Sequence, residues 1–264
     1  MKKKAALLLI LLLVLSTGCQ KTISLFEGRL VDLTHDFSAD TVYWPTSETF
    51  ELVTVFRGQT KGGFYYEANK FSASEHGGTH IDAPSHFVRG MTRVDEIPLE
   101  RLMGEAVIVD VSVKALTNPD YQVSSGDFLA WELEHGTIPE GAIVLLRTGY
   151  GRHWPDRQKY MGTAERGAGA VAKLHFPGLS PEGARWLVEN RRISAVGVDT
   201  LSIDYGQSKL FESHRILFKE NIPVFENVAN LEELPAKGAL VIALPMKIKG
   251  GSGGPLRIVA IVPE

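Results

Sequence analysis

Short apolar runs rich in Val, Ile, Phe and Tyr recur along this chain, and Gly, Pro or Asp tends to bound them. Runs of this kind predict β-strands. The predicted strands are Leu30–Leu33, Thr49–Phe56, Phe64–Phe71, Ala106–Val111, Ile143–Arg147, Ala195–Val198, Val224–Phe225, Leu240–Leu244 and Ile258–Val262. The order of these strands in a sheet does not follow from the pattern.

Three segments predict helices instead. The first runs from Ser125 to about Glu134. The second opens at Ser180-Pro181-Glu182, which combines an N-cap residue, a proline at the first helical position and an early acid, and it continues to about Val188. The third covers about Lys209 to Lys219, where apolar residues recur near helical spacing. Strands predominate and no internal repeat or low-complexity linker is present, so the sequence predicts a single mixed α/β domain.

The first residues have the layout of a signal peptide. A basic stretch (Met1–Lys4) precedes an apolar run (Ala5–Leu15), and small residues follow before Cys19. The apolar run is too short to span a bilayer, which takes about 20 residues. We therefore expect residues 1–19 to hold a signal peptide that is cleaved before Cys19, and residues 20–264 to form the mature domain.

The end of this leader, Ser16-Thr17-Gly18-Cys19, resembles a bacterial lipobox, in which the cysteine is lipidated and becomes the mature N-terminus. Ser16 stands where the commonest lipobox has Leu. Ordinary secretion with an incidental cysteine is the alternative. The resemblance implies an exported lipoprotein, tethered to the membrane of the bacterial cell envelope by acyl chains without spanning it.

Composition narrows the possible partners. Cys19 is the only cysteine, so disulfides contribute nothing to the mature domain and an apolar core must stabilise it. The formal net charge of the whole chain is −3, and loss of Lys2, Lys3 and Lys4 would take it to −6. Because no long basic run exists, nucleic acid is an improbable partner.

The segment from Glu75 to His86 carries the candidate chemistry. It places His76, His80 and Asp82 within seven residues, and imidazole and carboxylate groups are typical ligands of zinc or manganese. The adjacent glycines and Pro84 argue against a helix. In an extended chain the even-numbered side chains share one face, so these three groups and His86 would converge. Burying them without an ion would leave unpaired polar groups, which argues against a purely structural role.

Two distant residues are weaker candidates when taken alone. His214 lies on the third predicted helix and can be an ordinary helix-face histidine. Glu226 interrupts the apolar run Ile222–Phe225, where burial of its charge would require a partner.

The pattern His-x-Gly-Thr-His-x-Asp-x-Pro-x-His, from His76 to His86, resembles the signature of the Putative cyclase family, which includes bacterial kynurenine formamidases and isatin hydrolases. The similarity extends from Val31 to the C-terminal strand, and the segment Leu244–Gly251 is closer to isatin hydrolases. The resemblance implies a swivelling β/β/α fold and a homodimer. It also implies one or two metal ions bound by His76, His80, Asp82, His214 and Glu226, with His86 as an acid–base group and Trp44 lining the substrate pocket.

These residues together predict hydrolysis of an amide or lactam C–N bond in a small, aromatic substrate, either an N-formyl aryl amine such as N-formylkynurenine or a cyclic aryl amide such as isatin. A bound divalent ion lowers the pKa of water towards about 7 and polarises a carbonyl. His86 would move a proton to or from the leaving nitrogen, and its alternative role is an additional ligand. Trp44 can equally be a core residue. A lipid-anchored metal- or solute-binding protein and a metal-dependent lyase or isomerase are competing functions, and a pure binding protein would not need His86.

Other motifs in the sequence give weaker evidence of function. Gly250–Gly254 formally fits a nucleophile elbow, but that motif needs a helix directly after the serine. Here Pro255 and an apolar β-rich run follow, so the sequence predicts a turn between strands that can border the active site. The histidines without ligand-spaced partners are expected to be structural or exposed, and they are His35, His135, His153 and His175.

Overall fold

The computed structural model describes residues 28–264, and the predicted leader and Cys19 lie outside this range. Its strands are β1 (Arg29–Asp32), β2 (Glu51–Gln59), β3 (Tyr65–Ser72), β4 (His80–Asp82), β5 (Met103–Asp110), β6 (Gln122–Val123), β7 (Ile143–Arg147), β8 (Gly178–Leu179), β9 (Ala195–Val198), β10 (Val224–Glu226), β11 (Lys237–Pro245) and β12 (Gly253–Val262). Its α-helices are α1 (Leu99–Leu102), α2 (Ser112–Thr117), α3 (Ser125–His135), α4 (Arg157–Met161), α5 (Ala168–Val171), α6 (Pro181–Asn190) and α7 (Glu212–Lys219). None of the helices between residues 28 and 264 is both long and apolar enough to cross a membrane.

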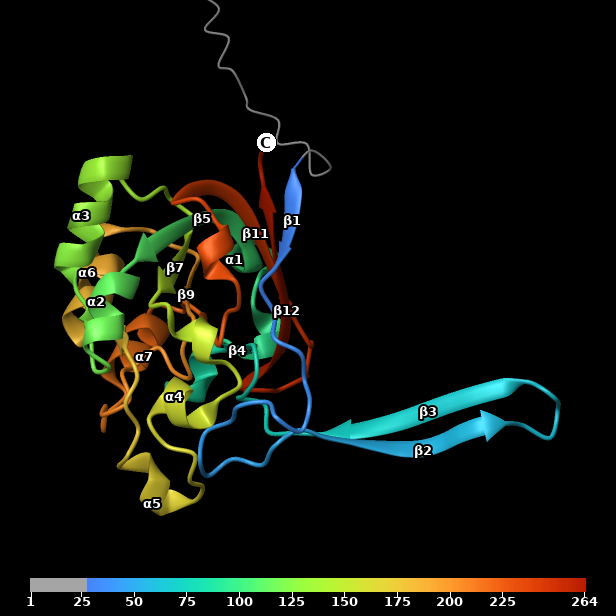
Figure 1. The fold of residues 1–264 in the computed structure, drawn as a ribbon. Helices are drawn as coiled ribbons and strands as arrows, with labels where there is room; N and C mark the ends of the chain where they lie inside the picture. The colour runs from blue at the N-terminus through green and yellow to red at the C-terminus, as the bar shows by residue number, and fades with distance from the viewer. Residues whose placement is uncertain (1–27) are drawn as a thin grey trace, which may run out of the picture.

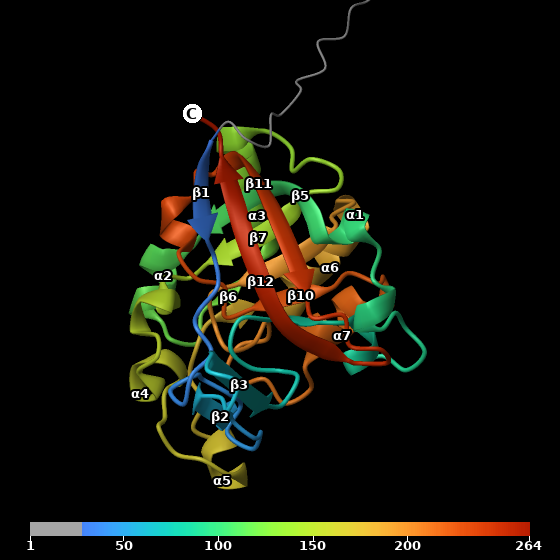
Figure 2. The ribbon, with the colours of Figure 1, turned by 90° about the vertical axis from the view of Figure 1, so that its right-hand side faces the viewer.

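One mixed sheet organises the molecule. Its strand order is β1-β12-β11-β5-β7-β9-β10-β4, with β5, β7, β9 and β10 parallel and the remaining pairs antiparallel. Strand β4 also pairs with the first residues of β12, where Gly253 lies opposite Asp82, so the sheet closes on itself. The long, curved β12 that crosses the front of Figure 2 makes this closure possible. The closure places β4 between β10 and β12.

Two apolar cores lie on the two faces of this sheet. Along β7, Ile143 and Leu145 join the cluster enclosed by the sheet, whereas Val144 and Leu146 join the cluster under the helices. Helices α3, α6 and α7 cover that second face, on the left of Figure 1. Because side chains alternate along a strand, a strand buried on both faces needs the continuous apolar run seen in the sequence. The predicted mixed α/β domain is confirmed.

Three helices were predicted, whereas residues 28–264 form seven α-helices, and the four short helices α1, α2, α4 and α5 were not predicted. Helices α3 and α6 cover the first two predicted segments, but α7 begins at Glu212 and not at Lys209. Phe211 has a left-handed backbone (φ 47), which a helix cannot include, and its amide donates to the Ser208 hydroxyl. The chain therefore turns before the helix starts.

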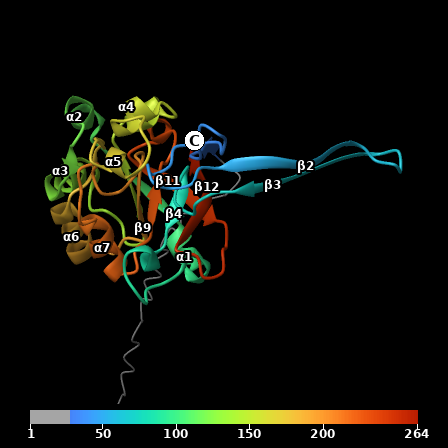
Figure 3. The ribbon, with the colours of Figure 1, turned by 90° about the horizontal axis from the view of Figure 1, so that it is seen from below.

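A long β2–β3 hairpin projects away from the body of the molecule (Figures 1 and 3). Residues 51–59 pair with residues 65–72, and most of their side chains are exposed. The first strand of the hairpin begins a few residues after Trp44, and its second strand ends shortly before His76. Its two roots therefore adjoin the candidate site.

Candidate metal centre

The segment from His76 to His86 is not extended throughout. The prediction that its even-numbered side chains share one face of an extended chain is therefore wrong for part of the segment. Only His80–Asp82 is a strand, and His86 ends a short 3-10 helix that starts at Pro84. Gly78 has φ +60, and a Cβ there would lie 2.7 Å from the Phe37 ring. The convergence of the three histidines comes from this tight turn and from the turn at Pro84.

His80 is held in one tautomer by the backbone of this turn. Its Nδ1 donates to the Gly78 carbonyl at 2.9 Å, and the Asn227 side-chain amide donates to the same oxygen at 2.7 Å. The remaining nitrogen, Nε2, is buried and makes no hydrogen bond, although it lies 3.1 Å from Asp82 Oδ1. A buried lone pair beside a carboxylate, with no donor between them, is the environment of a metal ligand.

His214 is oriented in the same way by Asp204. Its Nδ1 lies 2.6 Å from Asp204 Oδ2, while its Nε2 lies 3.1 Å from Asp82 Oδ2 and 3.0 Å from Glu226 Oε1. Asp204 also accepts hydrogen bonds from the backbone amides of Ser213 and His214 at the start of α7. The Asp204 carboxylate thus caps α7 and also fixes the orientation of the His214 ring.

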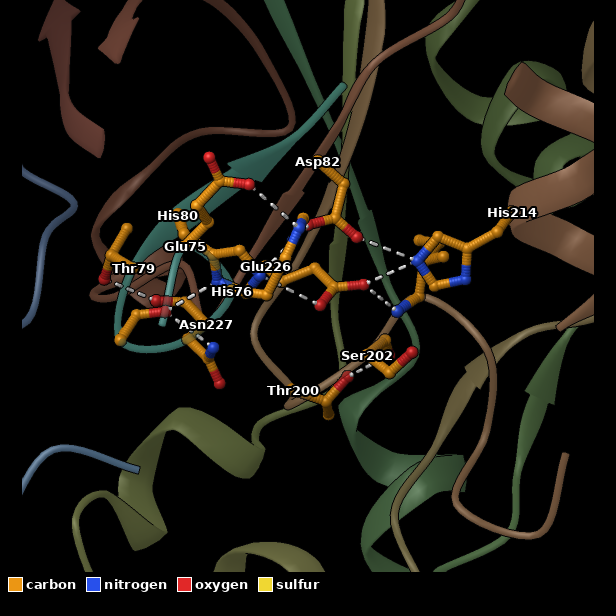
Figure 4. A network of polar contacts seen from close by, with 12 residues as sticks. Glu75, His76, Thr79, His80, Asp82, Thr200, Ser202, His214, Glu226 and Asn227 are labelled. Atoms are coloured by element: carbon orange, nitrogen blue, oxygen red, sulfur yellow. Dashed lines mark hydrogen bonds and ion pairs between the residues drawn. The ribbon is translucent and has the colours of Figure 1, made fainter. Parts of the chain in front are cut away.

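Strand pairing completes the site. In the antiparallel register of β10 and β4, Glu226 lies opposite His80, which places its carboxylate beside the histidine turn. The donor atoms form two groups that share Asp82, as Figure 4 shows between His214 on one side and His76 and His80 on the other. The two groups are His76, His80 and Asp82, and Asp82, His214 and Glu226. The structure therefore brings together all five residues that the family resemblance implied as ligands.

The buried carboxylates and imidazoles of this cluster shift one another's pKa values. Burial would raise the pKa of Asp82, but the neighbouring histidines hold it well below its usual value. Burial raises the pKa of Glu226, and the nearby Asp82 charge adds to the effect. Burial would lower the pKa of His214, yet its bonds to carboxylates hold it well above 6.5.

The residues present fit one or two divalent ions. Imidazole nitrogens and carboxylate oxygens are suitable ligands for zinc and manganese. His80, Asp82, His214 and Glu226 are each at most 4% exposed, so water does not solvate these groups well. Two carboxylates buried this deeply are costly unless a cation or a full set of donors compensates them.

A cavity of about 200 Å³ opens directly beside the five residues. Its apolar wall is built by Trp44, Phe87, Leu201 and Phe211. Trp44 packs edge-on against Phe211 at 6.0 Å between ring centroids and also contacts a small core cluster, so it is both a packing residue and a cavity wall. The cavity has the size and the flat apolar surfaces that suit a small aromatic molecule.

His86 lines the same cavity but belongs to neither donor group. Its ring stacks on His76 at 3.7 Å between centroids. Burial lowers the pKa of His86 to about 4, against the opposing charge of Asp82. A neutral imidazole at the cavity wall is able to accept a proton.

Sequence reasoning missed several residues that support the site. Asp204 had no assigned role, and Glu75 and Ser252 were not predicted to touch the histidines. Of the turn expected from Gly250 to Gly254, only residues 250–252 lie between strands, because β12 begins at Gly253. Serines and surface-type acids are too common for spacing alone to single them out. The hydrogen bonds that Asp204, Glu75 and Ser252 make join residues that are not neighbours in the sequence, so they can be seen only in the folded structure.

The remaining histidines lie outside the two donor groups. His35 stacks on Trp154 at 4.1 Å between centroids, and burial lowers its pKa to about 4. His175 pairs with Asp120 at the surface. These contacts agree with the structural or exposed roles expected for them.

Comparison with known proteins identifies the family. The Putative cyclase family matches residues 31–205, so the chain belongs to this family. The expected membership is confirmed.

Particular relatives share both sequence and fold. The chain is 32% identical to the isatin hydrolase of Roseibium aggregatum over 210 residues, which cover 76% of this chain and 77% of that protein. It is 28% identical to the kynurenine formamidase of Bacillus cereus over 235 residues, covering 87% and 95% of the two chains. The structure of isatin hydrolase A from Labrenzia aggregata bound to benzyl benzoate matches with a TM-score of 0.81 at 35% identity, over 89% of this chain and 94% of that one.

We expect Asp204→Ala to lower the free energy of unfolding by about 2 kcal/mol, because it removes a helix cap and the acceptor of His214. Urea denaturation in the presence of a chelator measures this change without metal binding. Asp120→Ala is the matched control, since its carboxylate pairs only with His175 at the surface, and its effect should stay within about 0.5 kcal/mol. Equal losses in the two variants would contradict the role of Asp204.

Proposed function

We propose that this chain is a metal-dependent hydrolase that cleaves the C–N bond of a small aromatic amide or lactam. The observation that carries the proposal is the Asp82 carboxylate, which is shared by two buried donor groups beside an aromatic cavity. The relatives named isatin hydrolase and kynurenine formamidase support this reaction class. N-formyl aryl amines and isatin-like lactams are the proposed substrates.

The cavity walls orient the substrate. Trp44, Phe87 and Phe211 line the cavity together with the donor groups, so an aromatic ring can pack on apolar side chains while its carbonyl lies near polar ones. This arrangement directs the carbonyl carbon of the bound amide towards Asp82 and His86. Side chains that exclude bulk water also strengthen the electrostatic interactions inside the cavity.

His86 carries the proton in this proposal. A divalent ion held by His76, His80, Asp82, His214 and Glu226 would polarise the carbonyl and make a water molecule more acidic. The neutral imidazole of His86 accepts the proton lost by the attacking water. It then donates this proton to the leaving nitrogen as the C–N bond breaks, so a carboxylic acid and an amine are formed.

Zinc and manganese are both proposed as the native metal, because imidazole nitrogens and carboxylate oxygens serve either ion. The two donor groups favour a pair of ions. Asp82 offers one carboxylate oxygen to each group, and Glu226 lies 3.0 Å from His214 and 3.5 Å from His80 through its two oxygens.

Removal of the metal should abolish hydrolysis. We expect chelator-treated protein to lose at least about 100-fold in kcat/KM for isatin or N-formylkynurenine and to regain it on addition of Zn²⁺ or Mn²⁺. His80→Ala should lose both bound metal and activity, whereas His175→Ala, at the surface, should keep both. Elemental analysis and product formation in the same samples measure the two effects. Full activity in metal-free protein would contradict the proposed function.

Replacing His86 separates proton transfer from metal binding. We expect His86→Gln to lower kcat roughly 100- to 10,000-fold while the metal content stays unchanged, because a general acid–base group contributes about this much. Steady-state kinetics and elemental analysis of the same preparation provide the measurement. Loss of metal in this variant would instead make His86 a ligand.

We also propose a homodimer, which the family resemblance implied, and we assign the β2–β3 hairpin to its interface. An isolated two-stranded hairpin is marginally stable in water. Leu52 lies opposite Phe71 on one face. A bulge after Thr54 turns Phe56 to the other face, where it stacks with Tyr66, so both faces carry exposed apolar side chains.

The exposed area of this hairpin is of the right order for a second copy of the chain. Aromatic side chains bury roughly 150–250 Å² each, so the five half-exposed aromatics of one hairpin offer roughly 500 Å². These five residues are Phe56, Phe64, Tyr65, Tyr66 and Phe71. Two reciprocal hairpins, each with its receiving surface, reach the roughly 800 Å² per partner of a stable interface.

Breaking the apolar surface of the hairpin should produce a monomer. We expect the protein to sediment as a dimer and the double variant Phe56→Ser, Tyr66→Ser to sediment as a monomer at the same concentration. Leu133→Ser on α3 is the control, since Leu133 is 91% exposed and far from the hairpin in sequence. A monomeric wild-type chain, or a dimeric double variant, would rule out this interface.

The exported lipoprotein predicted from the leader remains our proposal for localisation. It rests on the order of a basic stretch, an apolar run and Cys19 in the sequence. Expression in a bacterial host should place the wild-type chain in the membrane fraction, released by detergent. Cys19→Ser should abolish acylation, measured by incorporation of labelled palmitate. Equal labelling of the two proteins would refute the anchor.

A further inference from the structure

The turn between β11 and β12 reaches into the candidate metal centre. Gly253 pairs with Asp82, and a Cβ at position 253 would lie 2.5 Å from His76 Cε1. Ser252, the preceding residue, lies close enough to bond with the histidine. Because Gly253 has no side chain, the backbone between β11 and β12 can approach the His76 ring closely.

Three polar groups form a chain at this contact. Ser252 Oγ lies 2.7 Å from Glu75 Oε2 and 2.9 Å from His76 Nε2, and the Ser252 amide donates to the same Glu75 oxygen at 3.0 Å. At the other end, His76 Nδ1 lies 2.6 Å from Asp82 Oδ1. Figure 4 shows Glu75 and His76 side by side at the edge of the site.

The direction of the hydrogen bonds follows from the chemistry of the groups. An ionised carboxylate can only accept, so the Ser252 hydroxyl donates its proton to Glu75. The serine oxygen is then left as an acceptor for His76, and Nε2 must carry the hydrogen. Nδ1, which lies 2.6 Å from Asp82 Oδ1, is then the nitrogen left to face an ion. Without an ion it would donate a hydrogen bond to the Asp82 carboxylate, and a bound ion would take the place of that proton.

We propose that Ser252 and Glu75 are positioning residues that hold His76 as its Nε2-protonated tautomer and present Nδ1 to a metal ion. A ring flip would put a carbon atom next to Asp82 in place of this nitrogen, and the hydrogen bond to Ser252 selects against that flip. His80 and His214 have the Nδ1 hydrogen bonded and Nε2 inward, so His76 differs from both. The inference rests on the proposed metal-dependent function.

A merely structural contact would have different consequences. If Ser252 only tied the hairpin turn to Glu75, removal of its hydroxyl would lower the free energy of unfolding but leave the tautomer of His76 unchanged. A positioning role predicts loss of metal affinity with a mixed tautomer. Outer-shell partners of a ligating histidine typically contribute roughly 10- to 100-fold to metal affinity.

The test compares Ser252→Ala with the same change at a serine whose hydroxyl makes no hydrogen bond. Ser85 Oγ is buried without a partner, so Ser85→Ala removes a hydroxyl from the same region and is the matched control. Ser252→Thr keeps the hydroxyl and should restore the wild-type behaviour. Glu75→Gln removes the charge that fixes the direction of the serine hydrogen bond.

Two readouts are taken on the full chain. Chelator-stripped protein is titrated with Zn²⁺ in competition with a chromogenic chelator, and zinc-loaded protein labelled with ¹⁵N-histidine is examined by long-range ¹H–¹⁵N NMR. His76 is assigned by the signal that is lost in His76→Gln. Urea denaturation of each variant checks that it is folded.

We expect wild-type His76 to be the Nε2–H tautomer, and Ser252→Ala to bind one zinc ion roughly 10- to 100-fold more weakly with a mixed tautomer. Ser85→Ala and Ser252→Thr should stay within about threefold of wild type, well below that loss. An Nδ1–H tautomer in the wild type, or unchanged zinc affinity in Ser252→Ala, would overturn the inference alone. A wild-type chain that binds no zinc or manganese would instead refute the proposed function.

Discussion

The structure depends on a single buried carboxylate that faces two sets of donors. Asp82 Oδ1 lies near His76 and His80, and its Oδ2 lies near His214. A carboxylate that is 2% exposed is stable only if positive charge surrounds it, and here that charge must come from protonated histidines or from metal ions. In each of the three histidines, the ring nitrogen that points away from Asp82 is hydrogen bonded to an acceptor. The nitrogen that faces Asp82 is left to carry a proton or to bind a metal ion.

Closure of the sheet is what makes this environment possible. Strand β4 is only three residues long, but it pairs with β10 on one side and with β12 on the other. One neighbour supplies Glu226, and the other supplies the turn that carries Ser252. The backbone around the polar site is therefore already hydrogen bonded within the sheet. The side chains of the site are not needed as backbone partners and can bind one another and a substrate.

The sequence predicts the local part of the site better than the distant part. His76, His80 and Asp82 were recognised from their spacing, although the chain bends at Gly78 where we expected an extended segment. His214 lies 132 residues from Asp82, and only the family resemblance pointed to it. Asp204 and Ser252 carry no spacing signal, because their roles depend on which carbonyl or ring nitrogen the fold places opposite them. The longer strands were predictable from apolar runs. The short strands β4, β6 and β8 were not predicted, and the order and closure of the sheet depend on long-range pairing that a pattern does not encode.

Anomalous X-ray diffraction from crystals grown with Mn²⁺ or Zn²⁺ tests the central claim most directly. We expect a strong peak in contact with the Asp82 carboxylate and with His80 or His214, and a second peak on the other side of Asp82 when both donor groups are filled. Absence of any peak at Asp82 in crystals of protein that still hydrolyses its substrate would contradict it.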